Sequence, residues 1–542
     1  MGDMVNRKEG DGCRRMGGSR RLNAGLRIAL SGALVMVAVP ALSMEFDTGE
    51  SDVKVRWDNT LRYSLGNRLQ NASNSINNAA GFPFDQSNSL FKKGDFFTNR
   101  LDWLSELDMR YKEFGARVST AAWYDASYGS NAAHTNNPSA YVNDRFTSPV
   151  TRYYRGPSGE VLDAFVFGRA DVGTVPVDVR LGKHAVIWGE GLFGSTNSVA
   201  YSQAPSDSNK AVANPGASAK ETALPVWQMS AIAQLTDEVS VAGQYTFSWA
   251  TNRLPEGGTY FGAADTILLG PNVGREGAVN GKGGDIGLSA RWRPDWLDQG
   301  TIGMYYRNFD EKNPWASQLD TTTGLRRAVY ARDVNLYGLS LAKMVGGVSL
   351  GSEVSYRTNM PLNSRGQAGP DSYGARGETF HALLNGVKTF GQSPVFSSAA
   401  LATELAMTSL VKVTDNAAAY RGNGNAAAGC TTTDIVAGCS TRTFWTFGVS
   451  FTPTWTQVFP GVDLSMPLFY SINFKGSAPT NSGGFEGAQT VKVGLSAAVY
   501  QRHFIDLSFN YYHGKTDPAR GLVLGAPYND KANLMLTYQT SF

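Results

Sequence analysis

The stretch VKVRWDNTLRYSL, residues 53–65, decides the fold class of this chain. Apolar and aromatic residues recur at every second position from Val53 to Leu65, with Asn59 as the exception, and polar or charged residues fill the positions between. Successive side chains of a β-strand point to opposite faces, so this two-residue period predicts a strand with one apolar and one charged face.

The same period returns in residues 101–111 and 116–125, which the short segment 112–115 joins. Two alternating runs with a short turn between them predict a β-hairpin. Further tight connections are expected near 169–176, 236–238, 293–300, 346–347, 391–396, 456–461 and 501–503. Longer polar stretches separate the hairpins, at 70–96, 126–160, 191–222, 250–282, 310–332, 359–378 and 414–440.

Short turns that alternate with long loops are typical of outer-membrane barrels. A soluble sandwich is the rival fold, but its loops would not be systematically short at one end only. One strand on each side of the eight tight turns, together with the first and last strands, gives 18 strands. Because residues 161–185 also fit a single bent pair, 16 strands stay open. We expect an all-β, transmembrane antiparallel β-barrel of about 18 strands, with short periplasmic turns and long extracellular loops.

The N-terminal residues have the features of a secretory signal peptide. An uncharged run from Ile28 to Val39 follows the five arginines between Arg14 and Arg27, and small residues at Ala41 and Ser43 suit a signal peptidase. The apolar run is shorter than the roughly 20 residues of a membrane anchor, which is the alternative. We therefore expect a signal peptide over residues 1–43 with cleavage near Ser43, a short periplasmic segment over 44–52, and the barrel over 53–542.

Composition excludes other classes of protein. The chain has 542 residues, of which 42% are hydrophobic and 18% charged. After Met44 no stretch approaches the ~18 consecutive apolar residues of a transmembrane helix, which excludes a helical membrane protein. The net charge of +3 gives no electrostatic case for a nucleic-acid partner.

The C-terminus supports a barrel independently. Phe542 ends the chain, and Thr540, Tyr538, Leu536 and Leu534 step back from it two residues at a time. A terminal aromatic residue on an alternating strand is similar to the assembly signal of bacterial outer-membrane barrels, which implies the barrel-assembly machinery as a partner. Closure of the first strand against the last would remove both sheet edges, which a bilayer does not tolerate. Aromatic girdles facing the lipid would include Trp57, Trp103, Tyr111, Tyr305 and Tyr511.

Two cysteines follow the signal peptide, Cys430 and Cys439, in a stretch rich in small and polar residues. In an exported protein this spacing favours a disulfide that closes one loop. A zinc site is the weaker alternative, because two cysteines without neighbouring histidines are a poor ligand set. We therefore expect no metal.

A series of sequence blocks resembles the family catalogued as domain of unknown function 1302. The resemblance covers essentially the whole chain after the signal peptide, and it implies an outer-membrane location. It also implies a genomic setting, in which the gene lies beside those of a periplasmic lipoprotein-like partner and an inner-membrane exporter of the resistance-nodulation-division type. The blocks are Phe46 to Gly49, Trp57 to Tyr63, Asn99 to Asp102, Trp123 to Asp125, Trp188 to Glu190, Pro215 to Ala217, Lys220-Glu221, Leu224-Pro225, Leu336 to Ser340, Glu353 to Arg357 and Phe459 to Gly461.

If the apolar residues face lipid, the charged residues between them face the lumen. Charges of both signs keep a pore hydrated and set its selectivity. Pairing of these charges into a sealed polar core is the alternative. The expected channel-lining residues are Arg56, Asp58, Arg62, Arg100, Asp102, Glu106, Asp108, Arg110, Arg117, Asp125, Arg180, Glu353 and Arg357.

The long connection after Trp188 is the candidate constriction. Long loops often carry function, and the glycines and serines here suit a loop that folds into the barrel. A merely solvated outer loop is the alternative. The residues expected to form the constriction are Trp188, Glu190, Phe193, Lys220 and Glu221, and Phe193 with Tyr201 would form an apolar site.

These features favour an outer-membrane channel for passive or partner-gated passage of small or hydrophobic molecules. Such a channel needs outer-membrane lipids around it, no cofactor and no catalytic residue. A lipid or ester hydrolase is one alternative, and it would require a serine and a carboxylate beside His513 or His134 at the rim. A sealed structural or adhesive barrel is the other.

Overall fold

The structure, a computed structural model, describes residues 44–46, 52–77, 86–133, 141–193, 196–213, 222–262, 265, 268, 278–319, 326–365, 373–431, 436–481, 483–517 and 528–542. The expected signal peptide, residues 1–43, lies outside these described residues, as do the family blocks at Asp47 to Gly49 and Pro215 to Ala217.

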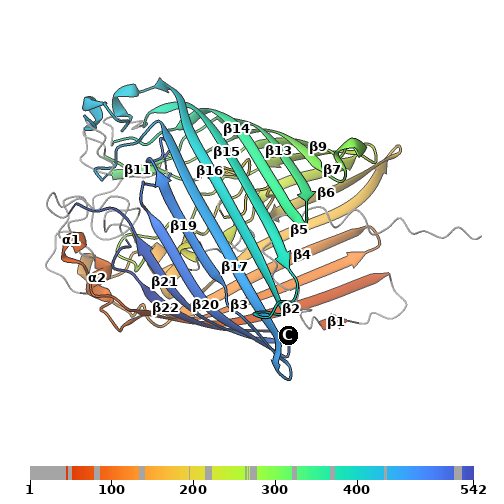
Figure 1. The fold of residues 1–542 in the computed structure, drawn as a ribbon, viewed down its shortest axis with the longest axis horizontal. Coiled ribbons are helices and arrows are strands. Elements are labelled where there is room, and N and C mark those ends of the chain that lie inside the picture. Colours follow the sequence, from red (N-terminus) through yellow and green to blue (C-terminus); the bar gives the residue numbers. More distant parts are fainter. Residues whose placement is uncertain are drawn as a thin grey trace, which may run out of the picture.

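The described chain forms one closed antiparallel β-barrel (Figure 1). Each wall strand pairs with the next, and the last pairs with the first, so that Tyr538 lies opposite Tyr63. The first nine wall strands are β2 (Val53–Arg68), β3 (Phe96–Tyr111), β4 (Phe114–Asp125), β5 (Ser158–Val172), β6 (Val175–His184), β7 (Val226–Gln234), β8 (Val239–Thr246), β9 (Ile286–Trp292) and β10 (Thr301–Phe309).

The remaining wall strands are β13 (Val334–Val345), β14 (Val348–Pro361), β15 (Arg376–Phe390), β16 (Ser398–Asp415), β17 (Thr443–Phe459), β18 (Val462–Ser465), β19 (Leu468–Lys475), β20 (Gln489–Val499), β21 (His503–His513) and β22 (Asn533–Ser541). Because β18 and β19 both lie between β17 and β20, they are two parts of one interrupted strand. The wall therefore has 18 strands, which confirms the predicted number. β5 and β6 are separate strands, which removes the alternative of 16.

Smaller elements decorate the barrel. β1 (Met44–Phe46) pairs with the start of β2, and β11 (Trp315–Leu319) pairs with β12 (Arg326–Val329) in a connection outside the wall. The helical elements are α1 (Asn74–Asn77), α2 (Gln86–Leu90), α3 (Ser148–Val150), α4 (Ser208–Ala213), η1 (Val142–Asp144), η2 (Thr151–Arg155), η3 (Asp295–Leu297), η4 (Ala417–Ala419) and η5 (Ala426–Ala428). Within the described ranges, none of these helices has the length and apolar character needed to cross a bilayer.

The two ends of the barrel differ as the sequence predicts. At one end, here called the turn end, consecutive strands are joined by short connections such as Gly346-Gly347 between β13 and β14. Both glycines have positive φ, 56° and 76°, which a two-residue hairpin turn requires and which residues with a Cβ rarely adopt. At the opposite end, here called the loop end and drawn at the left of Figure 1, long segments such as 185–225 join the strands.

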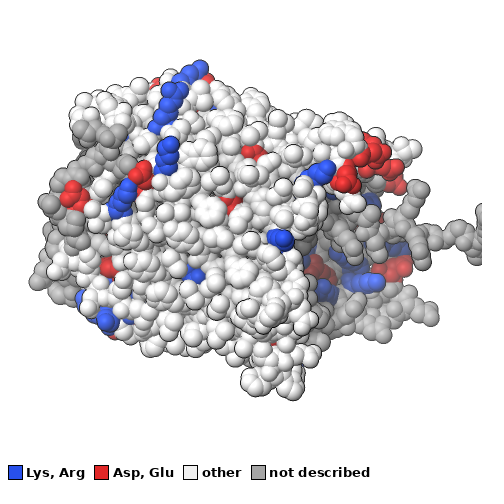
Figure 2. All heavy atoms as spheres, viewed as in Figure 1, with Lys and Arg blue, Asp and Glu red and all other residues white. Residues whose placement is uncertain are grey.

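The outer face of the wall is apolar. The register places Val55 beside Met109 and Trp57 beside Leu107, and the charged residues of β2 and β3 alternate with them on the inner face. Figure 2 shows few charged side chains on the visible flank of the barrel, and most of them lie toward its two ends. A charged side chain at the bilayer midplane of such a wall costs about 2–4 kcal/mol, so the pattern identifies a membrane-spanning barrel.

The prediction for one girdle residue is wrong. Trp57, Trp103 and Tyr111 are exposed on the outer face, but Tyr305 is buried inside the barrel. Its ring packs 6.2 Å from that of Trp188, and its hydroxyl lies 3.0 Å from Ser340 Oγ. Tyr305 belongs to the inward set of β10 because it lies opposite Gly338 and Ser289 of the inner face.

Candidate functional site

The described residues of the connection between β6 and β7, which spans 185–225, fold into the barrel. Its Trp188, Val199 and Tyr201 are at most 9% exposed, and they form one apolar cluster with inward residues of β10, β13 and β14. Val199 lies so close to Gly338 that a Cβ there would come within 2.5 Å of it. The segment is therefore packed against the wall. We call its described residues 185–193 and 196–213 the inner loop.

A buried carboxylate on β14 holds the inner loop. Glu353 is 2% exposed and points inward. It accepts hydrogen bonds from the backbone N–H groups of Glu190, Gly191 (3.1 Å) and Val199 (2.7 Å), and from Ser198 Oγ (3.2 Å). Backbone donors that converge on one ionised acceptor make strong, charge-assisted bonds, so Glu353 fixes two parts of the loop at once.

Two buried arginines hold the loop carbonyls. Arg357 on β14 donates to the carbonyl oxygens of Thr196 (2.9 Å) and Ser198 (3.0 Å), and its guanidinium lies 4.5 Å from the ring centre of Tyr201. Arg307 on β10 donates to the carbonyls of Val199 (2.9 Å) and Tyr201 (2.6 Å). Both arginines are at most 1% exposed, which leaves neither accessible to a passing solute.

The far part of the inner loop reaches β15 to β19. Glu404 of β16 accepts a hydrogen bond from the Leu192 N–H at 2.6 Å, and Asn385 of β15 donates to the Glu190 carbonyl. Phe193 packs edge-on against Phe469 of β19, with ring centres 5.3 Å apart. The inner loop therefore lines the wall from β10 to β19.

A small polar cavity lies between the inner loop and two other connections. Its volume is about 270 Å³, and its lining residues include Tyr201, Ser202, Asn252 and Asn313. Glu311 accepts hydrogen bonds from the Tyr201 hydroxyl and from Ser202 Oγ (2.6 Å). Burial and the neighbouring Glu311 carboxylate raise the pKa of Tyr201 well above its usual value, so this phenol stays a hydrogen-bond donor.

Aromatic side chains from several connections pack together at the loop end. Phe97 stacks on Tyr260 with ring centres 3.9 Å apart, and Tyr260 donates to the Lys531 carbonyl. The cluster also contains Phe91, Tyr128, Val150, Phe261 and Tyr512. These connections converge because each contributes an apolar ring that would otherwise face water. We call this group at the loop end, which includes Phe97 of β3 and Tyr512 of β21, the aromatic cluster.

The wall opposite the inner loop, β2 to β6, carries charges that stay partly exposed. Arg56 pairs with Asp58, Arg100 with Asp102, and Arg169 with Asp178. Arg117 contacts three carboxylates, those of Glu106, Asp108 (3.4 Å) and Asp163 (3.7 Å). The side chain of Arg117 is 32% exposed, against 0% for Arg357 under the inner loop.

Three arginines of this wall have no carboxylate within ion-pair distance among the described residues. Arg62 donates to Gln539 Oε1 at 3.0 and 2.9 Å. The guanidiniums of Arg110 and Arg180 lie over phenylalanine rings, at 5.5 Å from Phe167 and 5.8 Å from Phe165. Pairing of the luminal charges into a sealed polar core, the alternative to a hydrated pore, is therefore incomplete among the described residues.

The prediction for Asp125 is wrong, and the predictions for Lys220 and Glu221 stay untested. Asp125 is 2% exposed and accepts hydrogen bonds from Thr98 Oγ1 (2.6 Å) and from the N–H groups of Asn99 and Ser127 (2.9 Å each). It shapes the end of β4 and does not line an open lumen. Lys220 and Glu221, expected in the constriction, lie outside the described residues.

The structure joins Cys430 to Cys439 by a disulfide, with Cα atoms 5.7 Å apart. Both cysteines are buried in the connection between β16 and β17, and Asn425 and Cys430 form an isolated bridge there. The disulfide therefore closes a small loop outside the membrane wall. Among the described residues no group of three or more metal-ligating side chains occurs.

The histidines inside the barrel have structural contacts. His184 Nε2 lies 2.8 Å from Ser230 Oγ, but its Nδ1 faces the Gly182 carbonyl (3.0 Å) and not a carboxylate. This pair lacks the acid that orients the histidine in a catalytic triad. His381 is buried against Thr379, Thr408 and Asn197. His134, one of the expected rim histidines, lies outside the described residues.

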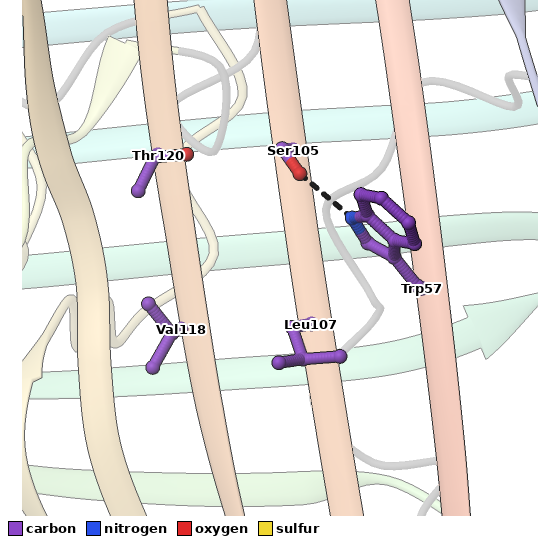
Figure 3. A pocket seen from close by; sticks show the side chains of 5 residues that line it. All are labelled: Trp57, Ser105, Leu107, Val118 and Thr120. Atoms are coloured by element: carbon purple, nitrogen blue, oxygen red, sulfur yellow. Dashed lines mark hydrogen bonds between the residues drawn. The ribbon is translucent and has the colours of Figure 1, made fainter.

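A second hollow, of about 450 Å³, lies on the outer face of the wall (Figure 3). Trp57, Leu107 and Val118 line it together with Ser105 and Thr120, and the Trp57 indole N–H donates to Ser105 Oγ at 2.8 Å. These side chains belong to the lipid-facing set of β2, β3 and β4. The hollow is therefore separate from the lumen.

Sequence reasoning missed the anchors Arg307, Asn385 and Glu404. Each is a polar residue at an inward position of an otherwise uncharged strand segment, and Glu404 is the one acidic residue between Ala399 and Val413. A lone polar residue at an inward position was the signal in the sequence that could have identified these anchors. The partners of these residues, backbone groups about 100 to 200 positions away, have no signature in the sequence.

Comparison with solved structures finds proteins that are similar to this chain over most of their length. A structure of Acinetobacter baumannii OccAB4 has a TM-score of 0.44 and 9% identity, and the match covers 90% of this chain and 98% of that one. A BenF-like porin from Pseudomonas fluorescens has a TM-score of 0.43 and 9% identity, with the same coverage. No curated protein matches the sequence.

A family model matches residues 24–542, which confirms the resemblance seen in the sequence. The chain belongs to the family described as "Protein of unknown function (DUF1302)".

Proposed function

We propose that this protein is an outer-membrane channel whose water-filled path runs between the inner loop and the wall β2 to β6. The observation that carries the proposal is the contrast in exposure across the lumen. Side chains such as Arg117 (32%) and Asp102 (32%) stay accessible, whereas Glu353 (2%) and Arg357 (0%) are covered. Charges that remain hydrated in a barrel line a path for solutes.

The inner loop would act as the constriction of this channel. Its backbone is bonded to β10, β14, β15 and β16, so it narrows the lumen from one side without blocking the opposite wall. Small solutes would pass passively along the charged wall. The aromatic cluster at the loop end would leave room for this path. A periplasmic or inner-membrane exporter partner would reach the barrel at its turn end and bias the opening from there.

The first test is ion conductance of the purified, folded protein in a planar bilayer, with a salt gradient across it. We expect stable steps and a reversal potential that changes in Arg62→Ala and Asp102→Ala. Unchanged reversal potentials in both variants would remove the β2 to β6 wall from the path. Silence from folded, heat-modifiable protein would favour a sealed structural barrel or a rim hydrolase instead.

A further inference from the structure

Four luminal side chains at the turn end of the charged wall form a patch with a distinct chemistry. The strand register aligns Arg110 with Gly115, Gly115 with Phe167, and Phe167 with Arg180 in one row across β3 to β6. The next row toward the loop end contains Phe165, opposite Arg117 and Gly182. We call Arg110, Phe165, Phe167 and Arg180 the arginine–phenylalanine patch.

The two arginines of the patch are cations without an acidic partner among the described residues. Arg110 and Arg180 are exposed, and their guanidiniums lie near Phe167 and Phe165. The carboxylates nearest in sequence have other partners, because Asp108 contacts Arg117 and Asp178 is held by both nitrogens of Arg169 (2.9 and 2.6 Å). The positive charge is therefore available to a ligand.

The two phenylalanines supply an apolar surface between the cations. Their ring centres are 6.1 Å apart, and both side chains are half-buried. Glycine at 115 makes room for one ring, because a Cβ there would come within 2.3 Å of Phe167 Cζ. Phe167 can therefore lie over the backbone of β4. The part of each ring that stays exposed lies beside a guanidinium in the lumen, where it can contact an apolar group.

We propose that this patch binds amphiphilic carboxylates, in which one ionised carboxylate is joined to an aromatic or other apolar ring. The arginines would each donate to the carboxylate, and the phenylalanines would contact the ring. The inference rests on the proposed channel for access to the lumen and deepens it by naming a substrate class. Phe165, Phe167 and Arg180 lie six to eight residues from the 173–174 turn, and Arg110 lies close to the 112–113 turn, so the patch would act as a filter on the charged wall.

Equilibrium binding and conductance together test the patch. Benzoate, acetate and benzyl alcohol are the probes, added to the folded full-length protein in detergent for calorimetry and to single channels in a bilayer. We expect benzoate to bind, and to reduce the chloride current, at lower concentration than either other probe, because only benzoate offers both groups.

The double variant Arg110→Gln/Arg180→Gln should weaken benzoate binding by at least about tenfold, the loss expected when charge-assisted bonds are removed. Phe165→Leu/Phe167→Leu should reduce the preference for benzoate over acetate and leave acetate unchanged. Arg502→Gln, an exposed cation in the β20–β21 turn at the same end, is the matched control and should bind as the parent does.

The outcomes separate the patch from the channel. Benzoate binding that the arginine variant leaves intact would overturn the patch, whether or not current flows. Conductance without any preference for benzoate over acetate would also overturn it. Binding that depends on the arginines, in protein that carries no current, would support the patch and contradict the channel. The Phe165→Leu/Phe167→Leu variant keeps both arginines, so it tests the patch independently if the arginine variant misfolds.

Discussion

Charged side chains on β2 to β6 and those on β10 to β16 face the same lumen, yet they are used differently. On the first wall, arginines and carboxylates pair side by side and stay partly exposed, as Arg100 and Asp102 do. On the second wall, Glu353, Arg357 and Arg307 are buried, and their partners are backbone groups of the inner loop. Arginines and carboxylates therefore anchor the inner loop where it covers them. They remain accessible to solutes where no loop covers them.

Removal of a loop anchor gives the largest expected effect. It would expose the wall β10 to β16 and so remove the difference in exposure between the two walls. Glu353→Ala leaves buried N–H donors of the inner loop without an acceptor, which costs the packed position of the loop about 3 kcal/mol. We expect the loop to leave the wall and single-channel conductance to change. Conductance and limited proteolysis within residues 185–213 measure this.

The matched control for this prediction is Glu378→Ala on the neighbouring strand β15. Glu378 contacts Tyr356 and Lys412 (3.0 Å) and takes no part in holding the loop. If both variants have parental conductance and parental protease resistance, Glu353 does not hold the loop.

A substitution on the exposed wall should change selectivity and leave the loop in place. Arg117→Gln removes the cation shared by Glu106, Asp108 and Asp163. Because the group is partly exposed, the cost in stability should stay near about 1 kcal/mol or less. The reversal potential should shift toward cation selectivity, with proteolysis of the inner loop unchanged. A shift toward anions, or a released loop, would contradict the distinction between the walls.

A pH dependence is expected from Glu190, whose side chain is near Glu353 and Arg291. Burial, followed by the repulsion from Glu353, raises the pKa of Glu190 above its usual range, and Arg291 opposes this. The packed loop therefore binds a proton more readily than the released loop. On this account, a fall in pH through that raised pKa favours the packed position, and a rise in pH weakens it.

Glu190→Gln should remove this contribution without removing the Glu190 backbone N–H that Glu353 holds. Loop proteolysis measured across pH in both proteins is the test. Equal pH profiles for the parent and the variant would exclude Glu190 as the group responsible.

The smallest effect is expected from the disulfide. Cys430→Ser/Cys439→Ser opens a short loop outside the membrane wall, so conductance, selectivity and the inner loop should stay as in the parent. The stability of the loop end should fall by less than the ~3 kcal/mol expected for a 15-residue loop, because the closed loop is shorter. Altered selectivity in this variant would contradict this prediction and would show that the disulfide loop affects the constriction.

The sequence predicts the wall far better than the site. Alternation from Val53 to Leu65 follows from the two faces of a strand, and it places Arg56, Asp58 and Arg62 correctly on the inner face. Tyr305 was placed on the wrong face because an aromatic residue on a strand suits a lipid interface as well as a packed lumen. Whether an inward charge meets solvent depends on what covers it, as the burial of Glu353 and Asp125 shows.

The inner loop is an intermediate case. Its length and composition suggested inward folding, but its anchors lie on β10 to β16, far from it in sequence. Hydrogen bonds such as Glu404 to the Leu192 N–H arise only when the closed barrel brings those strands opposite the loop. Contacts between residues so far apart in sequence leave no periodic pattern, so residue spacing alone cannot reveal them.

The most direct test of the two-wall account is labelling of single cysteines by a charged, membrane-impermeant thiol reagent. In the Cys430→Ser/Cys439→Ser background, one cysteine replaces Glu106 on the exposed wall or Ser355 on the covered wall. We predict rapid labelling and reduced current at position 106, and slow labelling at position 355, whose side chain is 2% exposed in the parent. Rapid labelling at 355 with protection at 106 would contradict the account.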